Sequence, residues 1–242
     1  MRLVFAHARA MTVELFRYPA FSVPTLGFPA LFFLLFVSSR HDRNATALVA
    51  SFAGFAFLTV ALFQFGVGVA AERETPWEQF LRTLPVRARV RFAARLLSGA
   101  LFGLASAALV AAAAVATTDV HLTTSRWVSL AAVVVIGAVP FGLLGIAVGY
   151  WASPRGAPAL ANVLYLLLAF VGGLWMTPAR LPGAVAAVSP YVPTRQFGDV
   201  LRGAAVGRLW QPNAWLVLLA WGVAFGLLAV WGYSRDEGRR YG

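Results

Sequence analysis

One charged stretch, residues 72–91, carries the side chains best suited to chemistry or recognition in this chain. It lies between two strongly apolar segments and contains three glutamates and five arginines: Glu72, Glu74, Glu78, Arg73, Arg82, Arg87, Arg89 and Arg91. Such groups form ion pairs and bind charged partners, and they are costly to place in hydrocarbon. Because short arginine-rich connections stay on the cytoplasmic side of a membrane, this stretch, the elbow, predicts the orientation of the whole chain.

The elbow also predicts a short helix with an apolar face. Pro76 suits a first helical turn and Pro85 ends the helix. Glu78 and Arg82, one turn apart, form a favourable pair. Four apolar side chains share one side of this helix: Trp77, Phe80, Leu81 and Leu84. A helix this short has no core of its own in which to bury that face. We therefore expect the apolar face to contact a partner protein or the lipid interface. The alternative is a solvated loop whose aromatic residues anchor at the headgroups.

The residue types that most enzymatic chemistry requires are missing or scattered. All twenty positive charges are arginine, so no lysine can serve a P-loop that binds ATP or form a Schiff base. There is no cysteine, which excludes disulfides, thiolate nucleophiles and thiolate metal sites. His7, His41 and His121 lie far apart in the sequence, which favours solvated loop residues over metal ligands. We therefore expect no catalytic residue, no metal site and no cofactor in this chain.

Composition indicates a membrane protein. Hydrophobic residues make up 60% of the 242 residues and charged residues 12%, which is more apolar chain than one water-soluble core can hide. The net charge of +11 is spread over loops and tails between apolar spans, so it favours anionic lipid headgroups over nucleic acid as partners. The predicted fold class is an all-α integral membrane protein with a single transmembrane domain over residues 1–242.

Residues 1–19 form an amphipathic segment. Their apolar side chains share one arc of a helix: Val4, Phe5, Ala8, Met11, Leu15 and Phe16. Charged and polar side chains share the opposite arc: Arg2, His7, Arg9, Glu14 and Arg17. A basic amphipathic helix that leads into a span predicts an interfacial helix on the cytoplasmic surface. A cleaved signal peptide fits less well, because charges continue to Arg17 and prolines interrupt the apolar residues that follow.

Six apolar segments are candidates for crossing a bilayer core, which takes about 20 residues of helix. They are residues 20–37, 46–71, 92–116, 127–151, 159–176 and 214–233. Pro24 and Pro29 predict a kinked start for the first span. Glycine pairs spaced by four residues predict close helix packing in three spans: Gly99 and Gly103, Gly145 and Gly149, Gly222 and Gly226.

Gln64 is the one strongly polar side chain within the second span. An unpaired amide in hydrocarbon is costly, so intramembrane amides face other helices or a pathway. Gln64 is therefore a candidate for lining a translocation pathway. The alternative is a hydrogen bond that holds two helices together.

The stretch before the last span is interrupted by Pro178, Pro182, Pro190 and Pro193 and is too apolar for a free loop. Residues 177–213 therefore predict a re-entrant or interfacial pair of short helices on the outer face, with an amphipathic helix at residues 194–204. With six spans, both termini lie on the cytoplasmic side with the elbow.

The pattern as a whole resembles the permease subunit of an ABC-2 type, or type V, ABC exporter. Two motifs show the resemblance most clearly. The first is Glu72-Arg73-Glu74 followed by Phe80-Leu81-Arg82-Thr83-Leu84-Pro85, which is similar to the family's acidic, leucine-rich coupling helix. The second is Pro190-Tyr191-Val192-Pro193 before the last span. The six spans and the N-terminal amphipathic segment extend the resemblance over essentially the whole chain.

The resemblance implies a division of labour between this chain and an ATPase. It implies a dimer of this permease with a second copy or a homologous permease, and two ABC ATPase subunits that bind ATP and Mg²⁺ and dock at the elbows. It implies a pathway formed mainly by spans one, two and five, and a location in the bacterial inner membrane. The implied cargo is an amphipathic drug-like or lipid-like molecule, including glycolipids, exported from the cytoplasm.

Three other functions compete with this interpretation. A self-contained secondary transporter or channel normally places ionisable residues at membrane depth, and no acidic residue lies deep in a predicted span. An intramembrane enzyme requires paired carboxylates, a serine–histidine set or clustered histidines on facing spans. A structural membrane subunit without cargo remains open at this stage.

Overall fold

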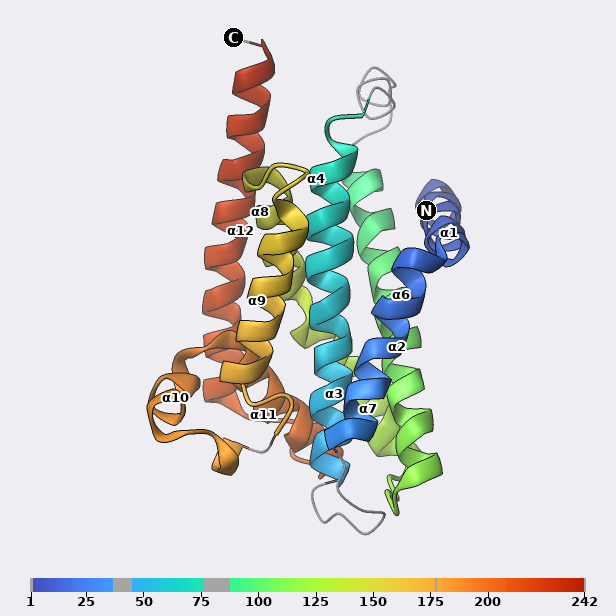
Figure 1. Ribbon diagram of the computed structural model, residues 1–242, viewed down its shortest axis with the longest axis vertical. Helices are drawn as coiled ribbons and strands as arrows, with labels where there is room; N and C mark the ends of the chain where they lie inside the picture. The colour runs from blue at the N-terminus through green and yellow to red at the C-terminus, as the bar shows by residue number, and fades with distance from the viewer. Residues whose placement is uncertain (1, 37–44, 76–87, 177, 242) are drawn as a thin grey trace.

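The computed structural model describes residues 2–36, 45–75, 88–176 and 178–241. Within these residues the secondary structure is entirely helical, and the longest helices run side by side along the long axis of the molecule (Figure 1). The predicted all-α fold is confirmed for this part of the chain. Long apolar segments without strand-like alternation favour helices, because a helix satisfies its own backbone hydrogen bonds in lipid.

Four helical stretches among the described residues are long and apolar enough to cross a membrane: Ala45–Glu72, Ala93–Thr117, Thr124–Trp151 and Pro212–Asp236. Helices α1 (Arg2–Arg17) and α2 (Pro19–Phe36) make a fifth if counted together, although they are bent by 75°. Helix α9 (Ala157–Val171) is apolar but only 15 residues long. The chain is therefore a multi-pass membrane protein, and the count of six spans stays a prediction.

The central span is built from three consecutive helical segments. These are α3 (Ala45–Val60), the π-helix η1 (Ala61–Val67) and α4 (Gly68–Glu72). In this span 83% of the most apolar stretch is buried, compared with 22% in the last helix. It packs against α2, the long helix α6 (Ala88–Thr117), α8 (Val139–Trp151) and α9. The span therefore lies at the centre of the bundle.

Two of the three glycine pairs bring helices into close contact, as the sequence predicted. A Cβ atom on Gly145 would lie 2.1 Å from the carbonyl oxygen of Ala61, so α8 and η1 touch backbone to backbone. Gly149 packs closely against the side chain of Val69 on α4. On α6, Gly99 and Gly103 accommodate phenylalanine rings of the central span. The third pair, on the last helix, makes only ordinary van der Waals contact.

Several helices end at other residues than the sequence predicted. The first span is one helix with Pro24 and Pro29 inside it, and the bend lies before it, between α1 and α2. The fourth is divided at Ala138 into α7 (Thr124–Gly137) and α8, because Pro140 starts a new helix. The fifth, α9, stops at Val171 rather than 176, since Gly173 turns the chain with φ +64°.

The last part of the chain contains the predicted short helices and a long final helix. The short ones are η2 (Pro178–Arg180), α10 (Gly183–Val188), η3 (Ser189–Tyr191) and α11 (Pro193–Ala205). Helix α11 agrees with the amphipathic helix predicted at residues 194–204. Helix α12 (Pro212–Tyr241) is longer than the predicted span and continues through the charged tail.

The two ends of the bundle differ in what they carry (Figure 1). At one end, α4 finishes, α6 starts and α12 finishes; we call this the elbow end. Helices α10 and α11 lie at the opposite end. Helix α1 packs against α6, where the ring of Phe16 contacts Phe102 at a centroid distance of 5.2 Å. Of the candidate site residues, this arrangement places Glu72 and Glu74 at the elbow end, with Gln64 in η1 of the central span.

Candidate functional site

The apolar face predicted for the elbow lies outside the described residues. Six of the predicted contact residues fall within residues 76–87 and remain a prediction: Trp77, Glu78, Phe80, Leu81, Arg82 and Leu84. Glu72, the last residue of α4, and Glu74 are described and exposed. Helix α6 begins at Ala88, four residues before the predicted span. The helices that flank the elbow thus leave and rejoin the bundle at the same end (Figure 1).

Arg73 fastens the start of the elbow to two other helices. Its Nη1 donates to Asp236 Oδ1 of α12 at 2.9 Å and to the carbonyl oxygen of Tyr150 at 3.0 Å, and its Nη2 donates to the carbonyl oxygen of Ala152 at 2.9 Å. The two carbonyls belong to the last turn of α8, where a positive charge complements the helix dipole. One nearly buried guanidinium therefore joins the ends of α4, α8 and α12.

A second ion pair crosses the base of the elbow. Arg95 of α6 donates to the carboxylate of Glu72 at the end of α4. Glu74 contributes much less, because its carboxylate is exposed and lies 3.9 Å from Arg73. The two helices that flank the elbow are consequently linked to each other as well as to α8 and α12.

Gln64 takes part in a hydrogen-bonded chain between three helices. Its Nε2 donates to Oγ of Ser98 on α6 at 3.2 Å, and Ser98 Oγ lies 3.0 Å from Oγ1 of Thr12 on α1. Gln64 and Ser98 are buried, and Oε1 of Gln64 has no hydrogen-bond partner. The contact is the helix-to-helix hydrogen bond that the sequence left open as an alternative, while a pathway-lining role for Gln64 remains a prediction.

Gln64 also lies in the middle of the π-helix η1. Segments of π-helix are rare and occur frequently at functional sites, because the wider turn disrupts the regular backbone ladder. The backbone of η1 lies very close to Gly145 of α8, so packing holds the irregular segment in place. The apolar sequence of the second span gave no sign of this irregularity.

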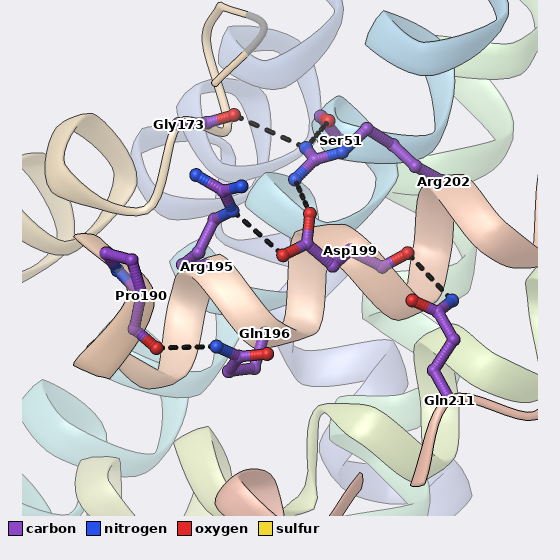
Figure 2. Close-up of polar contacts among 8 residues, drawn as sticks. All are labelled: Ser51, Gly173, Pro190, Arg195, Gln196, Asp199, Arg202 and Gln211. Atoms are coloured by element: carbon purple, nitrogen blue, oxygen red, sulfur yellow. Dashed lines mark hydrogen bonds and ion pairs between the residues drawn. The ribbon is translucent and has the colours of Figure 1, made fainter. Parts of the chain in front are cut away.

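A second charged cluster lies on α11 at the opposite end (Figure 2). Asp199 accepts hydrogen bonds from Arg195 Nε at 2.8 Å and from Arg202 Nη2 at 2.7 Å. Arg202 Nη1 also reaches Oγ of Ser51 on α3 at 2.8 Å and the carbonyl oxygen of Gly173 at 3.4 Å. Burial lowers the pKa of Arg202, and the hydrogen bond and charge of Asp199 oppose that shift.

The same helix closes the end of α9. Thr194 Oγ1, fully buried, donates to the carbonyl oxygen of Leu168 at 2.6 Å. Arg202 adds its contact to Gly173, just beyond the end of α9. Two residues of α11 thus donate to carbonyl groups at and just beyond the end of α9, and the Leu168 carbonyl also accepts from the backbone N–H of Gly172. The contacts fix α11 to both α9 and α3.

Sequence reasoning missed the partners of Arg73 and Arg202. Their spacing gives no signal, since Asp236 lies 163 positions from Arg73 and Ser51 lies 151 positions from Arg202. Among the described residues, no group of three or more histidines, cysteines or acidic residues could hold a metal ion. His7 lies on α1 and His121 precedes α7, while His41 lies outside the described residues.

Comparison with known proteins identifies one family. The sequence model described as ABC-2 family transporter protein matches residues 14–231. A search of curated proteins found no match. The matched range contains the elbow, the π-helix and both charged clusters except for Asp236.

Proposed function

The chain belongs to the ABC-2 family of transporter proteins, and on that premise we propose that it is the permease subunit of an exporter powered by a separate ATPase. Members of this family are membrane transport components that work with an ABC ATPase. The observation that carries the proposal is the family match, which extends over residues 14–231 of the 242. ATP and Mg²⁺ are bound by the ATPase, since this chain has no lysine for a P-loop.

The ATPase docks on the elbow. Its surface meets the apolar face formed by Trp77, Phe80, Leu81 and Leu84, with Glu72, Glu74, Glu78 and Arg82 providing charged contacts. Supporting this, the helices that flank the elbow are linked at their bases by the Glu72–Arg95 ion pair. A force applied to the elbow therefore reaches α4 and α6 together.

Export follows from rigid-body motion of the helices that meet at Arg73. When two ATPase subunits close on ATP, they push on the elbows and tilt α4, α6 and the ends of α8 and α12 as one unit. The opposite end of the central span is fixed through Ser51 to Arg202. The π-helix η1 lies between these two attachments and is the place where the central span bends.

The cargo is an amphipathic, drug-like or lipid-like molecule. Spans one, two and five are the pathway helices in the family resemblance, and they correspond to α2, the central span and α9. Aromatic rings pack between these segments. The ring centroids of Phe32 and Trp175 are 5.8 Å apart, and the centroid of Phe55 lies 5.7 Å from those of Tyr165 and Trp175. Such surfaces favour apolar cargo. The assembly contains two permeases and two ATPase subunits, with both termini of each permease in the cytoplasm of a bacterial cell.

Co-purification tests the docking surface. We expect the tagged chain, extracted from its native membrane in mild detergent, to retain a P-loop ATPase with measurable ATP hydrolysis. Leu81→Asp and Trp77→Asp introduce a charge into the apolar face, so each variant is expected to lose the ATPase while remaining a folded membrane protein.

The matched control is Leu209→Asp, which introduces the same charge at an exposed leucine on the opposite end. It is expected to keep the ATPase. Transport by the purified chain in vesicles without nucleotide or a second protein would contradict the proposal.

A further inference from the structure

An open apolar groove of about 540 Å³ lies between α6 and α12. Its floor contains residues of the central span, including Phe57, Ala61 and Phe65, and residues of α8. Its walls come from Leu96, Gly99 and Ala100 on α6 and from Gly226, Ala229 and Val230 on α12. The groove is separate from the elbow surface and from the aromatic residues of α2 and α9 that support the proposed cargo pathway.

Small residues create the hollow. Gly99 and Gly142 pack directly on the ring of Phe65, with Cβ positions that would lie 2.3 Å and 3.5 Å from its atoms. The absence of side chains at these positions lets the ring form the floor. Large residues stand at the rim, where Leu96 is 48% exposed, Val139 is 53% exposed and Val230 is 64% exposed. The groove therefore has the shape of an open channel that can receive a narrow apolar chain.

The groove occupies about half the length of the spans. On α12 its lining residues run from Gly226 to Tyr233, within a span that covers Pro212–Asp236. On α6 they begin at Leu96, close to the start of the span at Ala93. It thus extends from the middle of the membrane to the elbow end, which is the depth of one leaflet.

Two tyrosines and charged residues of both signs lie at the elbow end of the groove. Tyr150 and Tyr233 close it, with their rings 5.4 Å apart in an edge-to-face arrangement. Arg95, one turn before Gly99 on the same face of α6, is paired with Glu72. Asp236, one turn beyond Tyr233, is paired with Arg73.

We propose that this groove binds one phospholipid of the leaflet at the elbow end, with an acyl chain along Phe65 and a zwitterionic headgroup beside the Glu72–Arg95 pair. The apolar lining suits the acyl chain. In the groove that chain makes van der Waals contacts with the floor in place of contacts with other lipids. The Arg95 guanidinium complements a phosphate and the exposed Glu72 carboxylate complements an ammonium group. Among the described residues, the two ion pairs at this end, Glu72–Arg95 and Asp236–Arg73, are each neutral overall, which favours a zwitterionic headgroup over an anionic one.

The bound lipid contacts the proposed bending point and α6 at the same time. It lies on Ala61 and Phe65 of the π-helix and also touches α6, which starts at the elbow. A movement of α6 relative to the central span changes the width of the groove. The site is therefore placed to couple lipid composition to the position of the elbow. The binding site itself does not depend on the proposed ATPase partner.

Photo-crosslinking tests the site. The full chain in maltoside detergent micelles is mixed with a trace of phosphatidylethanolamine that carries a diazirine in the middle of one acyl chain. After illumination, adducts are mapped by mass spectrometry. We expect them to concentrate on Ala100, Leu143 and Val230 in the groove. Val223, an exposed residue of α12 outside the groove, is expected to carry about tenfold fewer adducts. That ratio corresponds to a difference in binding free energy of ~1.4 kcal/mol.

Two variants fill the groove from different helices. Ala100→Trp and Leu143→Trp are each expected to reduce labelling of Val230 by about tenfold. Val223→Trp adds the same side chain outside the groove and is expected to leave the labelling unchanged. Size-exclusion profiles and melting temperatures identify any variant that does not fold, and the wild-type adduct map stands without the variants.

Unlabelled competitors identify the headgroup. Phosphatidylethanolamine is expected to reduce the labelling more strongly than phosphatidylglycerol or a free fatty acid. Equal labelling of Val223 and the groove residues would overturn the site. Stronger competition by phosphatidylglycerol or by the fatty acid would overturn the zwitterionic lipid as its occupant.

Discussion

Arg73 donates a hydrogen bond of 2.9 Å to the carboxylate of Asp236, and this contact joins the end of the second span to the end of the last. Both side chains are nearly buried, at 12% and 11% exposure. The same guanidinium binds two carbonyl groups at the end of α8. The base of the elbow is therefore held to the ends of α8 and α12 by one side chain.

Removing Arg73 is expected to destabilise the elbow end. Arg73→Ala deprives the buried carboxylate of Asp236 of this charged partner, and breaking a buried pair in this way costs ~3 kcal/mol. The cost is measured as a lower melting temperature of the detergent-purified protein. Asp236→Ala combined with Arg73→Ala is expected to cost less than the sum of the two single changes.

Glu74→Ala provides the control for that experiment. Glu74 is exposed and lies 3.9 Å from Arg73, so its loss is expected to change stability by less than about 0.5 kcal/mol. Equal effects of Arg73→Ala and Glu74→Ala would show that the contacts of Arg73 to α8 and α12 do not hold the elbow end together.

Gly145→Ala is expected to destabilise the central packing. The added methyl group would lie 2.1 Å from the carbonyl oxygen of Ala61, so α8 and η1 must separate, at a cost of about 1–3 kcal/mol. Gly27→Ala is the matched control, because apart from the backbone of its own helix turn no atom lies within 4 Å of the added methyl group. Thermal unfolding of the two variants separates a packing effect from the general preference of helices for alanine.

Arg202→Gln is expected to loosen α11 from the bundle. The change removes the charged hydrogen bonds to Asp199 and Ser51. Amide hydrogen exchange measures the effect, and we expect faster exchange in α11 and at the end of α9. Arg208→Gln changes an exposed arginine just after α11 and should leave these exchange rates close to wild type. Similar acceleration in both variants would refute a specific role for Arg202.

Ser98→Ala is expected to weaken the contact between α1, α6 and η1. The hydroxyl of Ser98 is shared by Gln64 and Thr12, so its loss leaves a buried amide without this partner and costs about 1–3 kcal/mol. Gln64→Met combined with Ser98→Ala removes both partners and is expected to cost less than Ser98→Ala alone. Melting temperatures of Ser98→Ala, Gln64→Met and the double variant provide the comparison, and strictly additive effects would contradict the pairing.

Gln64 shows how far sequence reasoning reached at one residue. Its type and its apolar neighbours predicted that the amide must find a partner or a pathway, and the partner is Ser98. The sequence did not identify Ser98, because a serine in a span is common and carries no distinctive pattern. It also did not predict the π-helix, because the residues of η1 are as apolar as the rest of the span and carry no distinctive local pattern.

Some helix ends were missed even though a proline or glycine acts there locally, as at Pro140 and Gly173, and others were missed because distant contacts decide them. The amphipathic helix near residues 194–204 was recognised from its own charges and prolines, and α11 confirms it. The continuation of α12 through its charged tail was not predicted. Asp236 in that tail is held by Arg73, and a contact across 163 residues is invisible to a local pattern.

The sequence by itself determined the class of this protein: its apolar periodic segments require helices in a membrane, and the absence of lysine and cysteine excludes a P-loop and thiolate chemistry. Those properties depend only on composition and on order along the chain. Tertiary structure decided which charges meet, where the central span becomes a π-helix and where small residues open a groove beside Phe65. These features arise from side chains far apart in sequence, whose distances are set only when the helices pack.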